Sequence, residues 1–250
     1  MNVEQIIQGV FIMERNKRII AISDIHGCYT ELKKLIRKLE SEGEYDKDTD
    51  TLVFLGDYID RGPDSSKVIK FVRQLQQDNP NVMALMGNHE KMCIDYFEHG
   101  DSCWAFNGKR STVSSYRGIS DMSDDVKWMK TLPLYYETDS FIFVHAGINP
   151  DVPLEENTSY DLLWERDGFI YNPANFKKKI VFGHTPSILF NNTDKPYETI
   201  GGNIGIDTGC VFSGKLTALI LEDNEVIKYC QVSAETSFKK YLFESTSECA

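Results

Sequence analysis

Short apolar segments rich in β-branched residues recur along this 250-residue chain, and each has the length of a buried strand. The first of these segments occupy residues 18–23, 51–56, 81–87, 141–147 and 179–184. Further segments follow at residues 202–207, 215–221 and 225–232, and we expect them to be antiparallel strands near a sheet edge. Residues 30–39 and 65–75 repeat apolar side chains at helical spacing. Strands that alternate with helices of this length predict an α/β fold.

A single domain is predicted, because the chain shows no internal repeat, no low-complexity tract and no obvious linker. With 41% hydrophobic and 26% charged residues, the composition is typical of a globular protein. We expect the domain to span residues 1–250, with a core over about 18–235. Residues 1–12 and 236–250 are expected to be extensions of that core, with Met13 as an alternative start.

Composition also argues against several classes of protein. No run of 18 or more apolar residues is present, so we expect no membrane partner. The first residues lack the features of a secretory signal, and the six scattered cysteines include no CxxC pair. We therefore expect a reduced, cytoplasmic protein without a disulfide framework. The formal net charge of −11 argues against a nucleic-acid partner, whereas the oligomeric state is left open.

Five short motifs stand at the downstream ends of the first five predicted strands. They are Asp24-Ile25-His26-Gly27, Gly56-Asp57-Tyr58-Ile59-Asp60-Arg61-Gly62, Gly87-Asn88-His89-Glu90, His145-Ala146-Gly147 and Gly183-His184-Thr185. The carboxyl ends of strands in an α/β sheet open onto one crevice, so side chains from all five motifs are expected to converge. The converging groups would be Asp24, His26, Asp57, Asn88, His145 and His184. Four of the five histidines lie in these motifs, and the fifth, His99, is predicted to be a surface residue.

The convergent set supplies imidazole nitrogens, carboxylates and one amide oxygen, but no thiolate. These ligands suit manganese, iron, zinc or magnesium and do not choose among them. Manganese is our first expectation. Six groups are too many for one tetrahedral site that must also admit a substrate. Two divalent ions about 3.5–4 Å apart that share a carboxylate would accommodate them.

Each motif is a weak signal when it stands alone. An isolated Asp-x-His is usually a helix cap or a surface pair, and a histidine at a strand end is usually part of a hydrogen-bonded core. The order of all five motifs, and their placement at strand ends, is much more specific than any one of them.

Together the motifs resemble the PPP family of metallophosphatases, within the calcineurin-like metallophosphoesterase superfamily. The pattern of that family reads GDxHG, GDxxDRG, GNHE and then two later histidines, and Ser23 here replaces its first glycine. The resemblance runs from about residue 18 to about residue 222, and the segment Gly205–Cys210 resembles bacterial and lambda-phage-type members. It implies two mixed β-sheets sandwiched by helices, with a metal site at the strand ends.

The resemblance also implies a role for each motif residue. Asp24 and His26 would bind the first metal and Asp57 would bridge, while the second metal would be bound by Asn88, His145 and His184. His89 would be the general acid that protonates the leaving oxygen, with Asp60 orienting its ring. The phosphate would be bound by Arg61, by Asn88 and by Arg166, which follows Trp164-Glu165. The other interpretation of Arg166 is an ordinary surface ion pair.

The chemistry of this set favours a two-metal hydrolase of phosphate monoesters. Two divalent ions would lower the pKa of a bridging water, so that hydroxide attacks phosphorus near neutral pH. An alkoxide is a poor leaving group, which explains the need for an acid such as His89. A Cys-x5-Arg arrangement is absent from the sequence, so no covalent phosphoenzyme is expected. The main prediction is a serine/threonine or dual-specificity protein phosphatase that acts on a phosphoprotein or a small phosphoester.

Two alternatives are considered, of which the first is another hydrolase of the same superfamily and the second is not an enzyme. A symmetrical bis(5'-nucleosyl)-tetraphosphatase that cleaves diadenosine tetraphosphate is suggested by the segments Asp207–Cys210 and Leu216–Leu219. Against it, Asp60 and Glu90 are typical of the protein phosphatases. A non-catalytic binding scaffold is disfavoured, because every expected metal-binding and catalytic position is filled.

Residues 99–125 are the least regular stretch of the chain, rich in Ser, Gly, Asp and Asn. They are predicted to form a surface loop or a small cap over the site. Trp104, Asn107 and Tyr116 would line a substrate groove there, or else pack within the loop.

Overall fold

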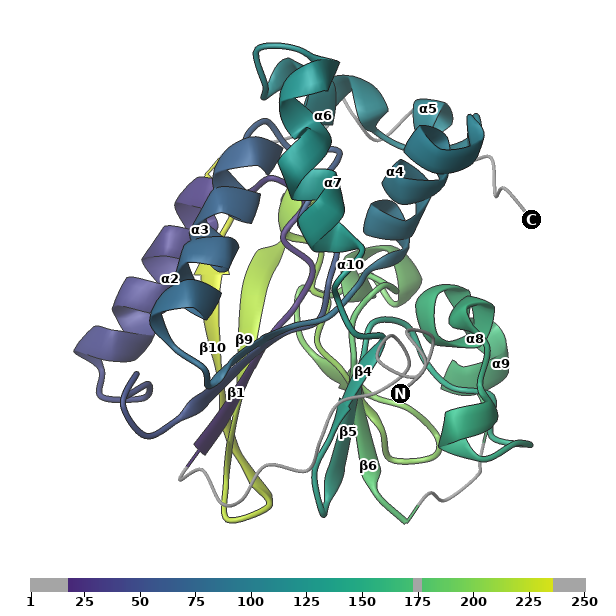
Figure 1. Ribbon diagram of the computed structural model, residues 1–250. Coiled ribbons are helices and arrows are strands. Elements are labelled where there is room, and N and C mark those ends of the chain that lie inside the picture. Colours follow the sequence, from purple (N-terminus) through teal and green to yellow (C-terminus); the bar gives the residue numbers. More distant parts are fainter. Residues whose placement is uncertain (1–17, 173–176, 236–250) are drawn as a thin grey trace.

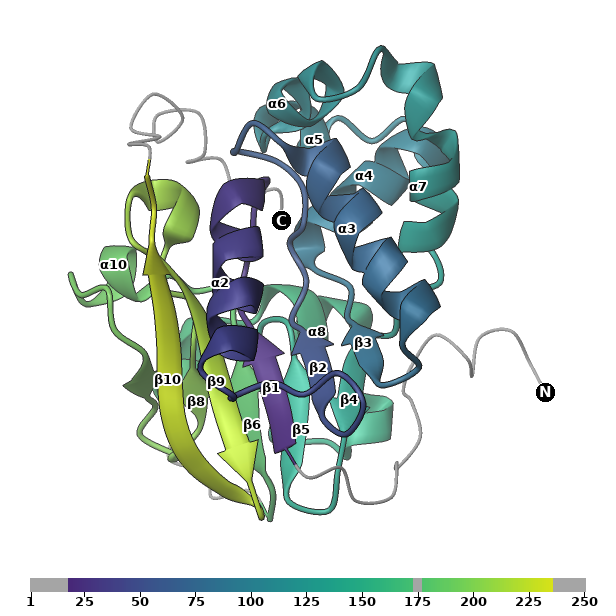
Figure 2. The same cartoon turned by 90° about the vertical axis from the view of Figure 1, so that its left-hand side faces the viewer.

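The computed structural model describes residues 18–172 and 177–235, and within them two five-stranded β-sheets form the centre of the fold (Figure 1). The predicted extensions at residues 1–12 and 236–250, and the alternative start at Met13, lie outside the described residues. Helices cover the outer face of each sheet, so the layers run helix, sheet, sheet, helix (Figures 1 and 2). The predicted α/β architecture, with two mixed sheets between helices, is confirmed.

The first sheet has the strand order β10-β9-β1-β2-β3. Its parallel strands are β1 (Arg18–Ile22), β2 (Thr51–Phe54) and β3 (Val82–Ala84). Two antiparallel strands extend it, β9 (Lys215–Glu222) beside β1 and β10 (Glu225–Ser233) at the edge. The antiparallel arrangement expected for these last two strands is confirmed.

The second sheet has the order β4-β5-β6-β8-β7. Its parallel strands are β5 (Phe141–Val144), β6 (Lys179–Phe182) and β8 (Ile204–Gly205). The antiparallel edge strands are β4 (Tyr135–Glu137) and β7 (Tyr197–Glu198). The sequence did not predict these two, because segments of two or three residues show no readable period. The antiparallel prediction for 202–207 is confirmed for the pairing of β8 with β7 and wrong for its pairing with β6, which is parallel.

Side chains that alternate along the strands divide the core in two. Ala21 and Val53 of the first sheet, with Phe143 and Val181 of the second, belong to one buried cluster between the sheets. Their neighbours along each strand, such as Ile20, point the other way and pack with the helices. Both faces of the central strands are therefore apolar, which is why these strands are continuous apolar runs in the sequence.

Two helices cover the outer face of the first sheet (Figure 2). They are α2 (Tyr29–Ser41) and α3 (Ser65–Asp78), which confirm the predictions for residues 30–39 and 65–75. On the opposite side of the molecule α8 (Ser159–Trp164) and α9 (Asp167–Ile170) lie beside the second sheet (Figure 1). The short helix α10 (Ser187–Phe190) follows β6, and two 3-10 turns in this half of the chain are Leu154–Glu156 and Cys210–Phe212.

A group of helices lies over the ends of the parallel strands, at the top of Figure 1. It comprises α4 (Asn88–His99), α5 (Cys103–Phe106), α6 (Lys109–Ser114), the 3-10 turn Ile119–Met122 and α7 (Ser123–Met129). Residues 99–125, expected as a loop or a cap, are thus mainly short helices. Within the described part of the chain, no helix is long and apolar enough to cross a bilayer.

The cysteines agree only in part with the prediction of a reduced chain. Cys28, Cys93, Cys210 and Cys230 carry free, buried thiols. Cys103 is disulfide-bonded, so the expectation of a fully reduced protein is wrong for this residue.

The cluster between the two sheets should carry much of the stability of the fold. Phe143 is fully buried there, so Phe143→Ala leaves a cavity and is expected to lower the free energy of unfolding by about 3–5 kcal/mol. Urea unfolding followed by circular dichroism measures this change. Phe106, which is 59% exposed, is the matched control, and Phe106→Ala should alter the free energy of unfolding by less than about 0.5 kcal/mol. Equal losses in both variants would contradict the assignment of the core.

Candidate metal centre

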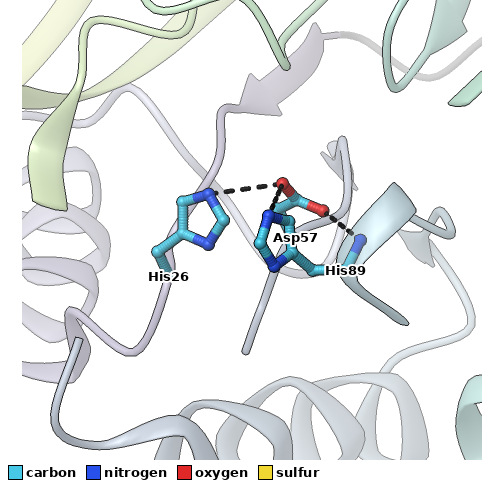
Figure 3. A group of neighbouring side chains, drawn as sticks. All are labelled: His26, Asp57 and His89. Carbon is cyan, nitrogen blue, oxygen red and sulfur yellow. Dashed lines mark hydrogen bonds and ion pairs between the residues drawn. The ribbon is translucent and has the colours of Figure 1, made fainter. Parts of the chain in front are cut away.

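Asp57 lies at the centre of the candidate site, on the turn that follows β2. Its Oδ2 atom is 3.3 Å from Nε2 of His26, and its Oδ1 atom is 3.5 Å from Nε2 of His145. Figure 3 shows the carboxylate between His26 and His89, whose Nε2 atom is 3.9 Å from Oδ2. Side chains that are far apart in the sequence therefore meet at the strand ends, as the motif positions predicted.

Two groups of buried side chains share this carboxylate. One group is His26, Asp57 and His89, and the other is Asp57, His145 and His184. In each group the possible ligand atoms lie within 4.8 Å of one another. An arrangement with one shared carboxylate between two sets of imidazoles is suited to a pair of cations.

Backbone carbonyls fix the protonation of two of these imidazoles. The Nδ1–H of His26 donates to the carbonyl of Ile59 at 2.8 Å, and the Nδ1–H of His145 donates to that of Leu55 at 2.9 Å. A carbonyl oxygen only accepts, so the proton is on Nδ1 and the lone pair of each Nε2 faces Asp57. Lone pairs directed at a carboxylate repel it, and a cation between them would turn that repulsion into binding.

Asn88 and His184 complete the second group. The Asn88 oxygen lies 3.0 Å from Nε2 of His145 and faces only hydrogen-bond acceptors. A cation among these atoms would stabilise this orientation of the amide. Without a cation, the turned amide would be more stable, because its NH₂ group would then donate to the same acceptors. Among the described residues, Nε2 of His184 is a buried nitrogen without a hydrogen-bond partner. An orphaned buried nitrogen beside these acceptors fits a divalent cation.

The electrostatics of the site favour neutral imidazoles. Burial, followed by the charge of Arg61, lowers the pKa of His26 to about 3. Burial likewise lowers the pKa of His145, and those of His89 and His184 by more. Neutral rings keep the lone pair that a metal ion requires, so the donor set fits divalent cations of intermediate softness.

Asp24 was expected to bind the first metal together with His26, but its contacts are with another residue. Its carboxylate accepts the backbone N–H of His184 at 3.0 and 3.1 Å. Within the described ranges it belongs to neither of the two groups around Asp57. Burial and then the charge of Asp207 raise the pKa of Asp24 well above its usual value. The role of Asp24 as a metal ligand stays a prediction.

Five of the predicted site residues adopt the left-handed backbone conformation. They are His26, Asp57, Asp60, Arg61 and His184, with φ between 46° and 70°. This conformation costs of order 1 kcal/mol for a residue with a side chain, and such strain collects at functional sites. Single-residue preferences do not predict it, because the surrounding contacts impose it.

Glu90 is one source of those contacts. Its carboxylate accepts the backbone N–H groups of Asp57 at 2.8 Å, Tyr58 at 2.9 Å and Gly87 at 3.0 Å. It therefore joins the turn after β2 to the start of α4. Gly87 has no room for a side chain, since an added Cβ would lie 2.2 Å from Oδ1 of Asp57. The sequence pattern used Glu90 only as a family marker and missed this structural role.

The predicted acid and its orienting carboxylate are in contact. The Nδ1–H of His89 donates to Oδ2 of Asp60 at 2.6 Å, which leaves Nε2 of His89 facing Asp57. Burial raises the pKa of Asp60 to about 8, and hydrogen bonds from Thr112 and Trp104 oppose that rise. The structure thus brings the pair together in the geometry that the predicted roles require.

The three residues considered for a substrate groove in 99–125 differ in their surroundings. Trp104 is fully buried, and its indole N–H donates to both oxygens of Asp60 at 2.9 and 3.0 Å. The hydroxyl of Tyr116 donates to Asp125 at 2.8 Å, and the amide of Asn107 donates to the carbonyl of Cys103 at 2.9 Å. Packing within the segment is therefore confirmed for Trp104, whereas Asn107 and Tyr116 are half-buried, and a groove at these two residues stays a prediction.

The two predicted phosphate-binding arginines differ in their surroundings. The guanidinium of Arg61 is in hydrogen-bond contact with Nε2 of His26 and lies 5.4 Å from the ring centroid of Phe212. Arg166 is exposed, in the turn between α8 and α9. After burial, its positive charge is the largest cause of the low pKa of His184. The ring of Trp164, two residues earlier, lies 6.3 Å from that of His184 between centroids.

Asp207 is a site residue that the motif analysis missed. It follows β8, and its carboxylate accepts the backbone N–H of Gly209 at 2.9 Å. Burial raises its pKa to about 7, and its charge acts on Asp24. The sequence did contain a signal for Asp207, because it stands at the end of the predicted strand 202–207. The carboxylates of the first two motifs also stand at the ends of predicted strands.

Comparisons with known proteins agree with this geometry. The sequence profile of the calcineurin-like phosphoesterase family matches residues 17–227. The chain is 30% identical to the asymmetrical bis(5'-nucleosyl)-tetraphosphatase PrpE of Oceanobacillus iheyensis, over 84% of this chain and 91% of that one. It is 26% identical to the symmetrical bis(5'-nucleosyl)-tetraphosphatase of Methylococcus capsulatus, over 89% and 98% of the two chains.

Solved structures share the fold. A crystal structure provisionally assigned as a diadenosine tetraphosphatase superposes with a TM-score of 0.69 at 22% identity, covering 91% of this chain and 98% of that one. A cold-active protein tyrosine phosphatase gives a TM-score of 0.61 at 19% identity, covering 95% and 84%. The sequence profile spans most of the chain, and the metal-binding motifs lie within it. This chain belongs to the calcineurin-like phosphoesterase family.

Proposed function

We propose that this phosphoesterase hydrolyses dinucleoside tetraphosphates. The observation that carries the proposal is the Asp57 carboxylate shared by two groups of imidazoles, an arrangement that suits a pair of cations. The substrate class is supported by the relatives from Oceanobacillus iheyensis and Methylococcus capsulatus, which are both named as tetraphosphatases. In the reaction, an oxygen of water bonds to phosphorus while the P–O bond to the leaving nucleotide breaks.

The residues that would hold the two cations follow from the contacts. His26 and Asp57 would contribute to one position, and the other would be bound by Asp57, Asn88, His145 and His184. Asp24 remains the predicted further ligand of the first position. Two divalent cations supply positive charge to the phosphate and make water a stronger nucleophile near neutral pH. The ligand set lacks a thiolate, which suits manganese, iron, zinc or magnesium, and manganese is our first candidate among them.

The protein's own groups handle the leaving oxygen and the phosphate charge. His89 would act as the acid in its imidazolium form, in which Nδ1–H is held by Asp60 and Nε2–H is transferred to the leaving oxygen, leaving the neutral ring. Arg61 and Arg166 would donate to the non-bridging phosphate oxygens, which gain charge as the leaving group departs. A tetraphosphate is strongly anionic, so these arginines also offset the net charge of −11 near the substrate.

Protein dephosphorylation is the second candidate function. Asp60 and the segment Asn88-His89-Glu90 favour it, because they match the protein phosphatase pattern. We rank it lower, because the relatives that cover most of the chain are named as tetraphosphatases. The metal-binding motifs contribute to both reactions equally and do not distinguish a nucleotide from a phosphopeptide.

A substrate comparison tests the ranking. The purified protein is supplied with manganese and assayed on diadenosine tetraphosphate and on a phosphoserine peptide. We expect kcat/KM to be at least about tenfold higher for the tetraphosphate. The products identify the position of cleavage, because AMP with ATP means asymmetrical hydrolysis and two molecules of ADP mean symmetrical hydrolysis. A preference for the peptide would overturn the proposed substrate.

A further inference from the structure

The carboxylate of Asp60 receives hydrogen bonds from two residues of the helical segment 103–114, as well as from His89. The indole N–H of Trp104 donates to both carboxylate oxygens, at 2.9 and 3.0 Å. The hydroxyl of Thr112 donates to Oδ1 and also accepts the backbone N–H of Asp60 at 2.8 Å. Asp60, Thr112 and Trp104 are all fully buried.

We propose that Trp104 and Thr112 are positioning residues for proton transfer by His89. They hold the Asp60 carboxylate in one orientation, and Asp60 in turn holds the imidazole so that Nε2 is presented at the metal centre. This inference rests on the proposed hydrolysis of a phosphoester, in which the leaving oxygen needs a proton.

Thr112 is suited to this task because it contacts Asp60 at two points. The same hydroxyl oxygen binds the side chain and the backbone N–H of Asp60, so it fixes χ1 together with the left-handed backbone at that residue. The backbone of the segment also approaches closely. A Cβ added to Gly108 would lie 2.6 Å from Cβ of Asp60, so only glycine allows the segment to come this near.

Trp104 is held by the helix that carries His89. Helix α4 begins with Asn88 and His89, and its other end carries Tyr96 and Phe97. Their ring centroids lie 5.4 and 6.2 Å from that of Trp104. His89 is thus part of α4, and Trp104 packs against the same helix. Both side chains contact Asp60, so the three groups form a rigid unit.

The segment is also tied to the rest of the fold away from Asp60. The backbone N–H of Ser66, in α3, donates to the Ser115 hydroxyl at 3.0 Å, and the Ser66 hydroxyl donates to the Ser115 carbonyl at 2.6 Å. Tyr116 donates to Asp125, as described above. These contacts anchor the segment without touching the acid, so they offer a control for damage to its packing.

A purely structural role and a positioning role predict different kinetics. If Thr112 only stabilises the fold, its loss lowers the rate for every substrate alike. If it positions the acid, its loss matters more when the leaving group is more basic, because a weakly basic group departs without a proton. Phenyl phosphate and p-nitrophenyl phosphate form such a pair, since phenolate is much more basic than p-nitrophenolate.

The kinetic test compares Thr112→Val, which removes the hydroxyl, with Thr112→Ser, which keeps it. With manganese present, we expect Thr112→Val to lower kcat by about tenfold on phenyl phosphate and by less than about twofold on p-nitrophenyl phosphate. Trp104→Phe, which keeps a ring but loses the N–H donor, should show the same split. Thr112→Ser and Tyr116→Phe should retain the parent kcat on both substrates. An equal loss on both substrates, or the absence of any loss, would overturn the proposal.

A spectroscopic measurement makes the test independent of turnover. The Nδ1 proton of His89, which lies in a 2.6 Å hydrogen bond to Asp60, should give a downfield resonance in the full chain labelled with ¹⁵N-histidine. We expect this resonance to shift or broaden in Thr112→Val and Trp104→Phe and to stay in place in Tyr116→Phe. An unmoved resonance in the first two variants would contradict the inference. A parent enzyme inactive on tetraphosphates would instead overturn the proposed substrate and leave this result interpretable.

Discussion

Asp57→Asn is expected to remove the hydrolytic activity by removing the metal ions. The carboxylate is the one group common to both sets of imidazoles, so its neutralisation weakens both cation positions together. A loss of about 4 kcal/mol of transition-state stabilisation corresponds to a kcat about 10³-fold lower. Elemental analysis of the purified variant should show less than one divalent ion per chain, measured beside the rate on diadenosine tetraphosphate.

The stability of the metal-free protein separates this effect from unfolding. In the metal-free parent, Asp57 faces the Nε2 lone pairs of His26 and His145, which do not stabilise an anion. Metal-free Asp57→Asn should therefore melt no lower than the metal-free parent, while added manganese should raise the melting temperature of the parent alone. Asp139, an exposed carboxylate that belongs to none of the five motifs, provides the control Asp139→Asn. A variant that keeps two ions and loses its activity would contradict the bridging role.

The strand and motif pattern predicted the parts of the fold that depend on local sequence. The β1, β2, β5 and β6 strands are buried on both faces, so each is an apolar run that can be read without knowledge of its partners. The convergence at Asp57 was also predictable, because the strand ends of such sheets face one crevice. The edge strand β7 was not, since Tyr197 and Glu198 form a strand only through their pairing with β8.

The contacts around the predicted acid could not be predicted from the sequence, for a different reason. Thr112 is 52 residues from Asp60 in the chain, and Trp104 is 44 residues away. Both come from a stretch whose polar composition resembles that of a surface loop. Their role arises from hydrogen bonds across space, and no spacing rule connects them to the Asp-Arg-Gly motif. The same holds for Glu90, whose carboxylate binds backbone N–H groups of the preceding motif.

The preference for a protein phosphatase shows what a metal-binding motif can and cannot indicate. Asp57, His145 and His184 would hold the cations, and Asp60 and His89 would deliver a proton. These steps are shared by the hydrolysis of a phosphomonoester and of a phosphoanhydride. The groups that would recognise an adenosine lie outside the five motifs, so the motifs rank the two substrates poorly.

His89→Ala should separate proton delivery from metal binding, because its two nitrogens have different partners. Nδ1 is bound to Asp60, and Nε2 is directed towards Asp57. Loss of a general acid lowers kcat by about 10²–10⁴-fold when the leaving group is strongly basic. We therefore expect a loss of at least about 10²-fold on phenyl phosphate, and a smaller loss on the tetraphosphate, whose nucleotide leaving group is a weaker base. Steady-state rates on both substrates measure the difference.

Metal content then distinguishes an acid from a ligand. The His89 ring lies within the first of the two groups around Asp57, so its position alone is compatible with either role. If it acts as the acid, His89→Ala keeps the same number of divalent ions as the parent, in contrast to Asp57→Asn. His99→Ala is the matched control, since that side chain is 71% exposed and should change neither the rate nor the metal content. A His89→Ala protein that loses one ion would make His89 a ligand, and proton delivery would then have to come from another group.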